Sequence, residues 1–376
     1  MPPLVLFTVG ALPSGGTEHM LAGLARRLRE RGRFASAIVN LSGEGALGQS
    51  IRATGVPVFD PLGRPSSGRL ATHRLDTTWR LRTILRRLRP AILQTTHASA
   101  DHHGRLAALG LGIPVLVWEQ NTKRETKAFR RLSRRRLARR TTLFLAQSPA
   151  VERAIRDEVG DVPIRLVGTF IDPARFPPAN DPSREAVRSI LGAEESDIVV
   201  GAAGRLVEQK NFPALLESIA ILLPAYPRLR LAIAGSGPLD AALRAEATRL
   251  GIEGRVSFLG HRTDLPALYR GFDIFCLSSS FCDYENVALE AMYAGLPCVL
   301  STAAPVSDDV RDEAVKAEPT AAALAAGIRT LLEEPERARD LGTRARAFAE
   351  ARTLEPYVER MESIYTEVLA PKAAGG

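Results

Sequence analysis

Residues 273–297 read DIFCLSSSFCDYENVALEAMYAGLP, and this stretch carries the pattern that predicts the fold. It begins with a short apolar run, Asp273 to Leu277, that is typical of a buried strand and ends in three serines. A helical pattern then starts at about Asn286 and stops at Gly295, because Asn favours a helix start and Gly a helix end. Strand, loop and helix in this order build a parallel α/β sheet, and the amino end of such a helix attracts anions.

The same unit recurs on both sides of this stretch. Further strand-like runs span Leu4 to Val9, Ala35 to Leu41, Pro57 to Asp60, Ala91 to Gln94, Pro114 to Trp118, Leu143 to Gln147, Ile164 to Val167, Ile198 to Ala203, Leu229 to Ala234, Val256 to Leu259 and Cys298 to Ser301. Residues 173–197 carry four prolines, which is typical of a linker. We therefore expect two Rossmann-like domains, 1–172 and 198–355, with parallel sheets facing across an interdomain cleft.

Length and composition agree with two domains. The chain has 376 residues and 45% hydrophobic side chains, enough for two ordinary cores. No segment reaches the roughly 18 consecutive apolar residues of a membrane-spanning helix, and the first residues lack the features of a secretory signal, so we expect a cytoplasmic protein. The three cysteines, Cys276, Cys282 and Cys298, form no CxxC pair, which argues against a disulfide framework or a zinc site.

Positive charge is concentrated in one segment. The net charge is +8, and residues 123–140 hold ten basic side chains against Glu125 alone. Such a run fits an anionic membrane, an acidic acceptor or nucleic acid, or it is a solvated helix face. Phe129 is the one aromatic residue among the arginines and no nucleic-acid motif is present, so we expect no nucleic-acid partner.

Two cations in the second half point to a phosphate ligand. Arg205 and Lys210 follow the strand 198–203, and the helix that starts at Asn286 follows a later strand of the same sheet. Parallel strands end at one edge of a sheet, so these groups are expected to meet there. Together they can neutralise a diphosphate whose charge grows as its bond to another group breaks. Since no DxD-like carboxylate pair appears where a divalent ion would be expected, we expect no metal and no cofactor.

Polar residues also follow strands of the first half. A turn with two glycines, Gly15 and Gly16, comes after the first strand and allows a ligand to approach the backbone. His97 follows the strand 91–94, and Glu119-Gln120-Asn121 follows the strand 114–118. Ligands of open α/β sheets bind at such strand ends, although a buried neutral histidine is the alternative for His97.

The chain resembles a known family, the retaining nucleotide-sugar glycosyltransferases of the GT-B fold, family 4. The resemblance covers most of the chain and rests on the order and spacing of its motifs. These are Pro13-Ser14-Gly15-Gly16-Thr17-Glu18, Ile171-Asp172 with Phe176, Gly204-Arg205-Leu206 with Lys210-Asn211, Gly235-Ser236-Gly237-Pro238, Val256-Ser257-Phe258-Leu259-Gly260, Asp264-Leu265-Pro266 with Tyr269, and Asn286-Val287-Ala288-Leu289-Glu290-Ala291-Met292 with Ala294-Gly295-Leu296-Pro297.

The resemblance implies a metal-independent hexosyltransferase (EC 2.4) that moves a sugar from a nucleoside-diphosphate-sugar donor to a glycan or lipid-linked acceptor with retention. In that reading Arg205 and Lys210 bind the donor diphosphate, and Glu290 holds the ribose hydroxyls. The other donor-side residues are Gly15, Gly16, Gly204, Gly235, Gly237, Gly260, His261, Arg262, Asn286 and Val287, and the acceptor-side residues are His97, Glu119, Gln120 and Asn121. The resemblance also implies that the final helix, about 356–370, packs back on the first domain.

Two departures from the family pattern matter. The family has an acidic residue eight positions before Glu290, where this chain has Cys282. Asp283 takes that catalytic role if the loop is one residue shorter, and Glu285 is the third candidate. Members often carry a histidine after the strand 114–118, where this chain has Gln120, which hydrogen-bonds a sugar but moves no proton. A catalytically impaired GT-B-like binding module is therefore the second hypothesis.

Overall fold

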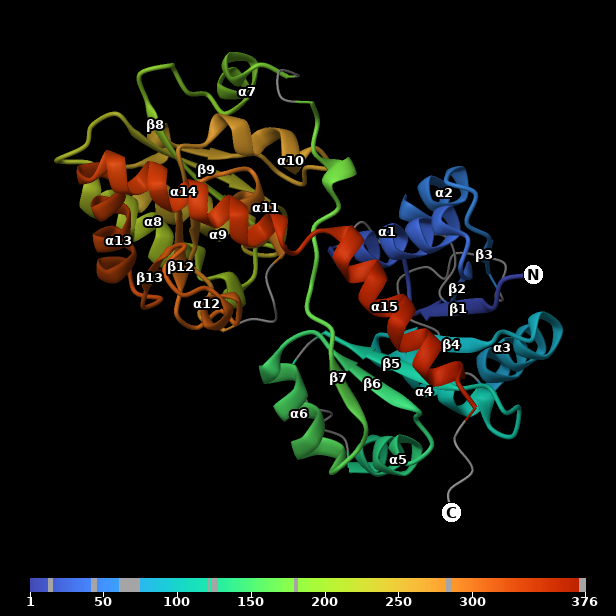
Figure 1. Ribbon diagram of the computed structural model, residues 1–376. Helices are drawn as coiled ribbons and strands as arrows, with labels where there is room; N and C mark the ends of the chain where they lie inside the picture. Colours follow the sequence, from blue (N-terminus) through green and yellow to red (C-terminus); the bar gives the residue numbers. More distant parts are fainter. Residues whose placement is uncertain are drawn as a thin grey trace. The chain divides into compact units, whose positions relative to one another are not determined.

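The computed structural model describes residues 1–12, 16–41, 46–60, 75–120, 122, 128–178, 182–281 and 286–371. The chain forms two compact units, one of Met1–Phe170 with Leu354–Gly376 and one of Ile171–Thr353. Each unit consists of a parallel sheet with helices packed on its faces (Figure 1). This confirms the predicted class, two α/β domains built on parallel sheets.

In the described part of the first unit, a seven-stranded sheet has the order β3-β2-β1-β4-β5-β6-β7. Its strands are β1 (Leu4–Val9), β2 (Ala35–Asn40), β3 (Val58–Phe59), β4 (Ile92–Thr96), β5 (Val115–Glu119), β6 (Leu143–Ala146) and β7 (Ile164–Leu166). Its helices are α1 (Gly16–Arg31), α2 (Ala46–Ala53), α3 (Leu75–Leu88), α4 (Ala98–Ala108), α5 (Ala128–Ala138), α6 (Pro149–Val159) and α15 (Leu354–Leu369). Successive strand side chains point to opposite faces, so Val5 and Leu6 of β1 enter different cores.

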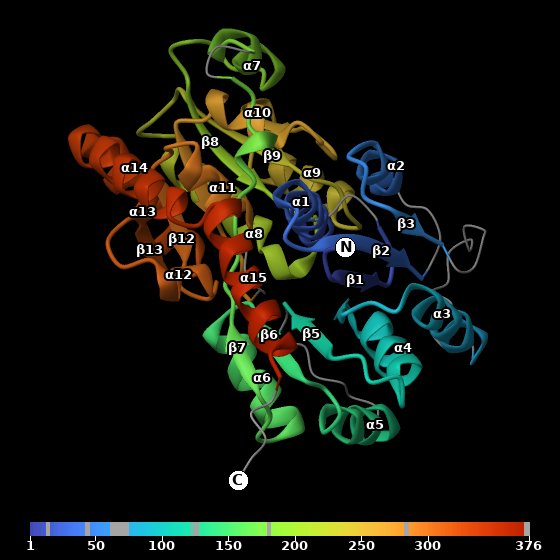
Figure 2. The ribbon, with the colours of Figure 1, turned by 45° about the vertical axis from the view of Figure 1, so that its right-hand side comes forward.

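The last helix of the chain, α15, belongs to the first unit and packs beside α1 (Figure 2). Its apolar face supplies Tyr357 and Met361 to the core. The hydroxyl of Tyr365 donates a 2.6 Å hydrogen bond to the side chain of Gln94 on β4. On the outer side, Arg31 of α1 donates to Glu355 over 3.0 Å. Apolar burial and these polar contacts together fix α15 on this sheet.

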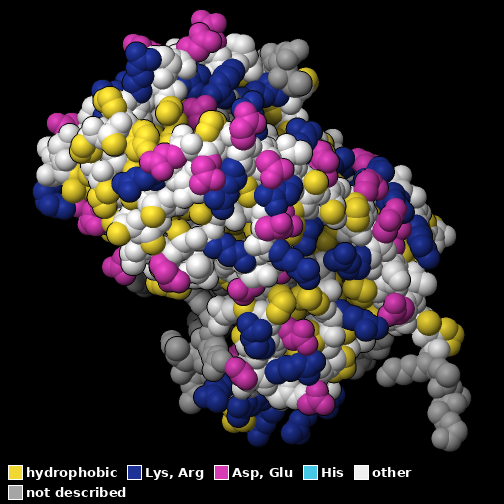
Figure 3. Space-filling model, turned by 60° about the vertical axis from the view of Figure 1, so that its left-hand side comes forward, with side chains coloured by type: hydrophobic (Ala, Val, Ile, Leu, Met, Phe, Trp, Pro, Cys, Tyr) yellow, Lys and Arg dark blue, Asp and Glu magenta, His cyan; other side chains and the backbone are white. Residues whose placement is uncertain are grey.

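In the described part of the basic helix α5, Arg134 faces inward. Arg134 pairs with Glu119 at the end of β5 and, over 3.0 Å, with Glu158 of α6. The other arginines that follow it on α5 are exposed. Figure 3 shows Lys and Arg side chains gathered at the lower end of the view, the level at which Figure 1 places α5. The helix therefore combines an internal ion pair with a positively charged surface.

The second unit repeats the same architecture, with a six-stranded sheet of order β10-β9-β8-β11-β12-β13 in the described residues. Its strands are β8 (Ile198–Ala203), β9 (Leu229–Ala234), β10 (Val256–Phe258), β11 (Ile274–Leu277), β12 (Cys298–Ser301) and β13 (Val315–Ala317). Its α-helices are α7 (Arg184–Ile190), α8 (Phe212–Leu222), α9 (Asp240–Arg249), α10 (Leu265–Leu268), α11 (Asn286–Tyr293), α12 (Val306–Asp309), α13 (Ala321–Glu333) and α14 (Pro335–Glu350), and its short 3-10 helices are η1 (Pro173–Arg175), η2 (Glu208–Lys210), η3 (Glu253–Arg255) and η4 (Tyr269–Gly271).

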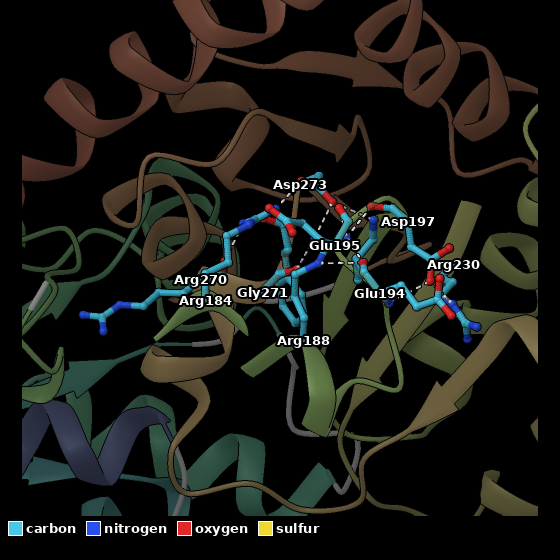
Figure 4. Close-up of polar contacts among 11 residues, drawn as sticks. Arg184, Arg188, Glu194, Glu195, Asp197, Arg230, Arg270, Gly271 and Asp273 are labelled. Carbon is cyan, nitrogen blue, oxygen red and sulfur yellow. Dashed lines mark hydrogen bonds and ion pairs between the residues drawn. The ribbon is translucent and has the colours of Figure 1, made fainter. Parts of the chain in front are cut away.

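The expected linker, 173–197, differs from the structure, because this segment is packed on the second unit. Val187 of α7 and Leu191 are buried in the core of that unit. Arg188, 3% exposed, donates to backbone carbonyls, including Gly271 over 3.3 Å, and pairs with Asp273 over 3.1 Å (Figure 4). The prolines favoured a linker in the sequence, but the apolar spacing of α7 and its buried arginine fix the segment instead.

Both sheets have their strand order reversed about one pair of neighbours. In the first unit this switch point lies between β1 and β4, and in the second between β8 and β11. Ligands of open parallel sheets bind outside the carboxyl ends of the strands at such points. The fold therefore predicts that ligands bind at the loops that follow these four strands.

Candidate functional site

The loops that follow β8, β9 and β10 form one hydrogen-bonded surface in the second unit. The amide of Leu206 donates to the carbonyl of Ser236 over 3.0 Å, and the amide of Leu239 donates back to Leu206 over 3.1 Å. The amide of Gly235 donates to the carbonyl of Gly260 over 2.8 Å. These bonds fix the three loops relative to one another at the carboxyl edge of the sheet.

Two predicted donor-binding glycines are required for this close crossing. A Cβ atom on Gly235 would lie 1.8 Å from the carbonyl oxygen of Gly204, and one on Gly237 would lie 2.4 Å from that of Leu206. Any side chain at either position would force the two loops apart. Gly235 and Gly237 thus have a structural role beside the predicted one.

The two predicted cations lie beside the switch point of the second unit. The side chain of Lys210 runs next to Gly204, since a Cβ built there would lie 3.6 Å from three of its carbons. The hydroxyl of Ser278, after β11, donates to the carbonyl of Lys210 over 2.8 Å, which joins the two loops of the switch point. Arg205 is exposed, and its guanidinium forms no ion pair with a described residue. Positive charge is therefore available at this edge.

The start of α11 and the carboxylate of Glu290 complete this region. Asn286 is the first residue of α11, and the carbonyl of Val287 accepts a 3.1 Å hydrogen bond from the hydroxyl of Tyr269. Glu290, one turn later, is 6% exposed. Its Oε1 accepts a 2.6 Å hydrogen bond from Arg175, and its Oε2 accepts one of 3.1 Å from Tyr269. Burial raises the pKa of Glu290, while the positive charge of Arg175 and the Tyr269 hydroxyl lower it.

Sequence reasoning missed Arg175. The residue lies on η1, within the Ile171-Asp172…Phe176 motif, and its partner is 115 positions away in the sequence. An isolated arginine in a proline-rich segment gave no signal of a buried partner. The order of the motifs predicted that Glu290 lies in the donor site. It contained no information on which residue neutralises the charge of Glu290.

The predicted loop 260–262 combines an exposed residue with a paired one. His261 is exposed. Arg262 is held by Asp264 through two hydrogen bonds of 2.8 and 2.6 Å, and this pairing raises the pKa of Arg262. Four other predicted residues, Gly15, Asn121, Asp283 and Glu285, lie outside the described residues, as does Cys282.

At the switch point of the first unit, Glu18 and His97 form a pair. Gly16 and Glu18 begin α1, and His97 immediately precedes α4 with φ of 74°, which is uncommon for a residue other than glycine. The Nε2 of His97 lies 3.5 Å from the Oε1 of Glu18. Burial raises the pKa of Glu18 and lowers that of His97, so the site favours the neutral form of each group. Strained backbone of this kind is concentrated at functional sites.

The described residues at the end of β5, Glu119 and Gln120, are buried. Glu119, expected on the acceptor side, is bound by Arg134, and burial raises its pKa. Gln120 accepts a hydrogen bond from the hydroxyl of Thr17 at the start of α1. The Nε2 of Gln120 is buried and has no hydrogen-bond partner among the described residues. A buried donor of this kind is expected to meet a ligand or a water molecule.

Within the described ranges, no group of three or more His, Cys, Asp or Glu side chains is placed to hold a metal ion. No helix within those ranges combines the length and apolarity that crossing a membrane requires. Cys276 and Cys298 are buried and free, as expected for structural thiols.

The sequences of both units match models of known protein families. The model for glycosyltransferase family 4 matches residues 14–175, and the model for glycosyl transferases group 1 matches residues 183–348. The chain belongs to the family 4 glycosyltransferases. This family 4 chain is 33% identical over 148 residues to the mannosylfructose-phosphate synthase of Agrobacterium fabrum, a match that covers 37% of this chain and 32% of that protein. It is 29% identical over 153 residues to the lipopolysaccharide core biosynthesis mannosyltransferase LpsB of Rhizobium meliloti, covering 39% and 43%.

Those matches span less than half the length of either relative, whereas structural similarity extends over the whole chain. The crystal structure of Anabaena HepE in complex with UDP superposes with a TM-score of 0.83 at 22% identity, covering 98% of this chain and 100% of that chain. At this level of identity the likeness establishes the fold. The family 4 chain therefore has the GT-B fold that its sequence predicted.

Proposed function

We propose that this family 4 protein transfers a sugar from a nucleoside-diphosphate-sugar donor to a hydroxyl group of a glycan or lipid-linked acceptor, with retention at the anomeric carbon and without a metal ion. One observation carries the proposal: Arg205 and Lys210 lie at the switch point of the second unit, whose other side leads to α11 and Glu290. Support also comes from the names of its relatives, a mannosyltransferase of lipopolysaccharide core synthesis and a GT-B protein bound to UDP.

The proposed reaction assigns a task to each group. Arg205, Lys210 and the amides at the start of α11 stabilise the negative charge that grows on the leaving diphosphate. The bond from the anomeric carbon to the phosphate oxygen breaks while the bond to the acceptor oxygen forms on the same face. The leaving phosphate accepts the proton of the acceptor hydroxyl. Positive protein groups are the means by which the chain holds this charge.

The remaining roles divide between the two units. Glu290 binds the ribose hydroxyls, and Asp283 binds the donor sugar in place of the usual residue eight positions before Glu290. On the acceptor side, His97 and the free amide of Gln120 offer hydrogen bonds to sugar hydroxyls. These neutral groups suit a hydroxyl-rich acceptor.

The competing hypothesis is a binding module without catalysis, because Cys282 and Gln120 depart from the family pattern. Both hypotheses are tested by thermal stabilisation with a panel of nucleotide sugars, followed by analysis of the products. A donor at about 100 times its dissociation constant adds roughly 2.7 kcal/mol to the free energy of unfolding. The proposal expects stabilisation and release of the nucleoside diphosphate in EDTA, both lost in Glu290→Ala. Stabilisation without any turnover would favour the binding module, and turnover that vanishes with EDTA would overturn metal independence.

We also propose that the acceptor is presented at an anionic membrane surface. Between α5 and α6 lies a hollow of about 420 Å³, whose lining includes four arginines and one carboxylate: Arg135, Arg136, Arg139, Arg156 and Asp157. Beside it the side chain of Leu132 is exposed, which suits the apolar side of a lipid interface. Each cation near an anionic leaflet contributes about 1 kcal/mol.

Sedimentation with vesicles tests this part of the proposal. Binding to phosphatidylglycerol vesicles is expected to fall as salt rises and to be absent with pure phosphatidylcholine. The double variant Arg136→Glu/Arg139→Glu is expected to lose most of the binding, whereas Arg337→Glu/Arg339→Glu on the second unit serves as the charge-matched control. Equal binding by both variants would overturn the assignment to this surface.

A further inference from the structure

A buried ion pair connects the segment that enters the second unit with helix α11. Arg175 of η1 donates a 2.6 Å hydrogen bond to Oε1 of Glu290, whose side chain is 8% exposed, while the arginine side chain is 30% exposed. The other carboxylate oxygen accepts from Tyr269 over 3.1 Å. The charged Arg175 thus donates to one carboxylate oxygen of Glu290, and the neutral Tyr269 donates to the other.

Arg175 is held in place by its neighbours on both sides. The side chain of Asp172 accepts a 3.1 Å hydrogen bond from the amide of Ala174, which caps the short helix. The ring of Phe176 stacks on Tyr269 with centroids 6.4 Å apart, and it meets the ring of Tyr293 edge-on at 4.8 Å. These contacts tie η1 to η4 and α11, so the guanidinium is directed at Glu290 by a structured segment.

The charge balance around Glu290 depends on Arg175. The described ionisable groups that face the carboxylate are Arg175 and Tyr269, with the thiol of Cys298 behind Tyr269. Burial raises the pKa of Tyr269 and that of Cys298, so both are neutral near pH 7. Arg175 is therefore the group among them that offsets the cost of a buried negative charge on Glu290.

We infer that Arg175 is a positioning residue that keeps Glu290 ionised and correctly oriented for the two ribose hydroxyls of the donor nucleotide. The inference rests on the proposed function, in which Glu290 binds the ribose. A carboxylate has about four acceptor positions, so one bond from Arg175 and one from Tyr269 leave an acceptor on each oxygen. A protonated carboxyl group loses part of this capacity and would discriminate poorly between ribose and 2′-deoxyribose.

The test compares the binding of UDP and 2′-deoxy-UDP by calorimetry, or of the matching pair for whichever base stabilises the wild-type protein. Wild type is expected to prefer the ribonucleotide by about 10- to 100-fold, the value of a hydrogen bond to a charged group. Arg175→Met and Arg175→Gln are expected to lose most of this preference at pH 7 and to regain it as the pH rises, because without its partner the buried Glu290 ionises only at higher pH. Arg175→Lys keeps the charge and is expected to retain most of the preference.

Arg184→Met is the matched control, since Arg184 binds Asp273 in the same unit and contacts neither Glu290 nor Tyr269. Having Gln as well as Met at position 175 keeps the test valid if one variant folds poorly. Equal weakening of the binding of both nucleotides, or a preference that is unchanged in both variants at all pH values, would overturn the inference without overturning the proposed function. Failure of the wild-type protein to bind any nucleoside diphosphate would overturn the proposed function, and the inference with it.

Discussion

The switch points of the two units have the same topology and opposite chemistry. In the second unit, β8 and β11 lead to Arg205, Lys210 and the amino end of α11, and the loops cross so closely that glycine is required. In the first unit, β1 and β4 lead to Glu18 and His97, whose surroundings favour their neutral forms. The switch point of the second unit therefore offers fixed positive charge, whereas that of the first unit offers hydrogen-bonding groups in their neutral forms.

The proposed function assigns a different task to each of these switch points. A leaving diphosphate needs charge that is already in place, because reorganising dipoles during the reaction costs free energy. A hydroxyl acceptor is uncharged, so it needs hydrogen-bond partners but no strong electrostatic field. The Nε2 of Gln120, which has no partner among the described residues, belongs to the first unit, in agreement with this division. Three experiments test the comparison, in order of expected effect.

The largest effect is expected from Gly235→Ala compared with Gly10→Ala. The added Cβ would lie 1.8 Å from the carbonyl oxygen of Gly204 in the second unit, whereas at Gly10 the nearest heavy atoms lie 3.9 Å away, in ordinary contact. We expect Gly235→Ala to destabilise the second unit by about 3 kcal/mol or more and Gly10→Ala to change stability by less than about 1 kcal/mol. Hydrogen exchange measured by mass spectrometry should show increased exchange around residues 204–239 in Gly235→Ala alone.

Tryptophan fluorescence reports the unfolding of the first unit independently of the second. Both tryptophans of the chain, Trp79 and Trp118, lie in the first unit, so their fluorescence reports on that unit. Similar stability of the two variants would show that the loop crossing is no more demanding in the second unit than in the first.

Most of the fold was predictable because it depends on local patterns. Continuous apolar runs gave the strands β1, β8, β9 and β12 with the observed bounds, since strands of a parallel sheet are buried on both faces. The edge strand β13, three residues long with an exposed central lysine, lacked that signal and was missed. Residues 173–197 were misinterpreted for a related reason, because prolines are visible in the sequence and a buried partner for Arg188 is not.

The candidate site was predictable only in its local parts. The motif around Glu290 identified a helix start with a carboxylate one turn inside. The partners of that carboxylate, Arg175 and Tyr269, are 115 and 21 positions away, so local spacing could not reveal them. Likewise, Glu119 was expected to face the acceptor, but Arg134 of the basic helix binds it. Pairing across the sequence is a property of the packed structure.

The second prediction concerns charge at the switch point of the second unit. Lys210→Ala and Arg205→Ala are each expected to weaken binding of a nucleoside diphosphate by about 1.5–3 kcal/mol, the value of a charged hydrogen bond. Binding of the nucleoside itself should change little, because it lacks the phosphates. Calorimetry with both ligands measures the difference, and His97→Ala in the first unit is the comparison variant. A variant that weakens the nucleoside equally would place its side chain away from the phosphates.

The smallest expected effect sharpens the chemistry of the first unit. Burial raises the pKa of Glu18, so the folded state favours the protonated carboxyl; this contribution to stability is full at low pH and is lost as the pH rises through the folded pKa. Glu18→Gln mimics the protonated form, and we expect it to be more stable than wild type by about 1 kcal/mol near pH 8, with the advantage shrinking towards about pH 5. Denaturant unfolding followed by tryptophan fluorescence measures this unit, and Glu30→Gln, on the exposed side of α1, is the control expected to change stability by less than about 0.5 kcal/mol. His97, whose pKa burial lowers, contributes in the opposite direction, since its stabilising neutral form is lost as the pH falls.

An advantage of Glu18→Gln that grows towards acid pH would mean that Glu18 and His97 are held together as an ion pair. The contrast between the two units would then rest on the second unit alone.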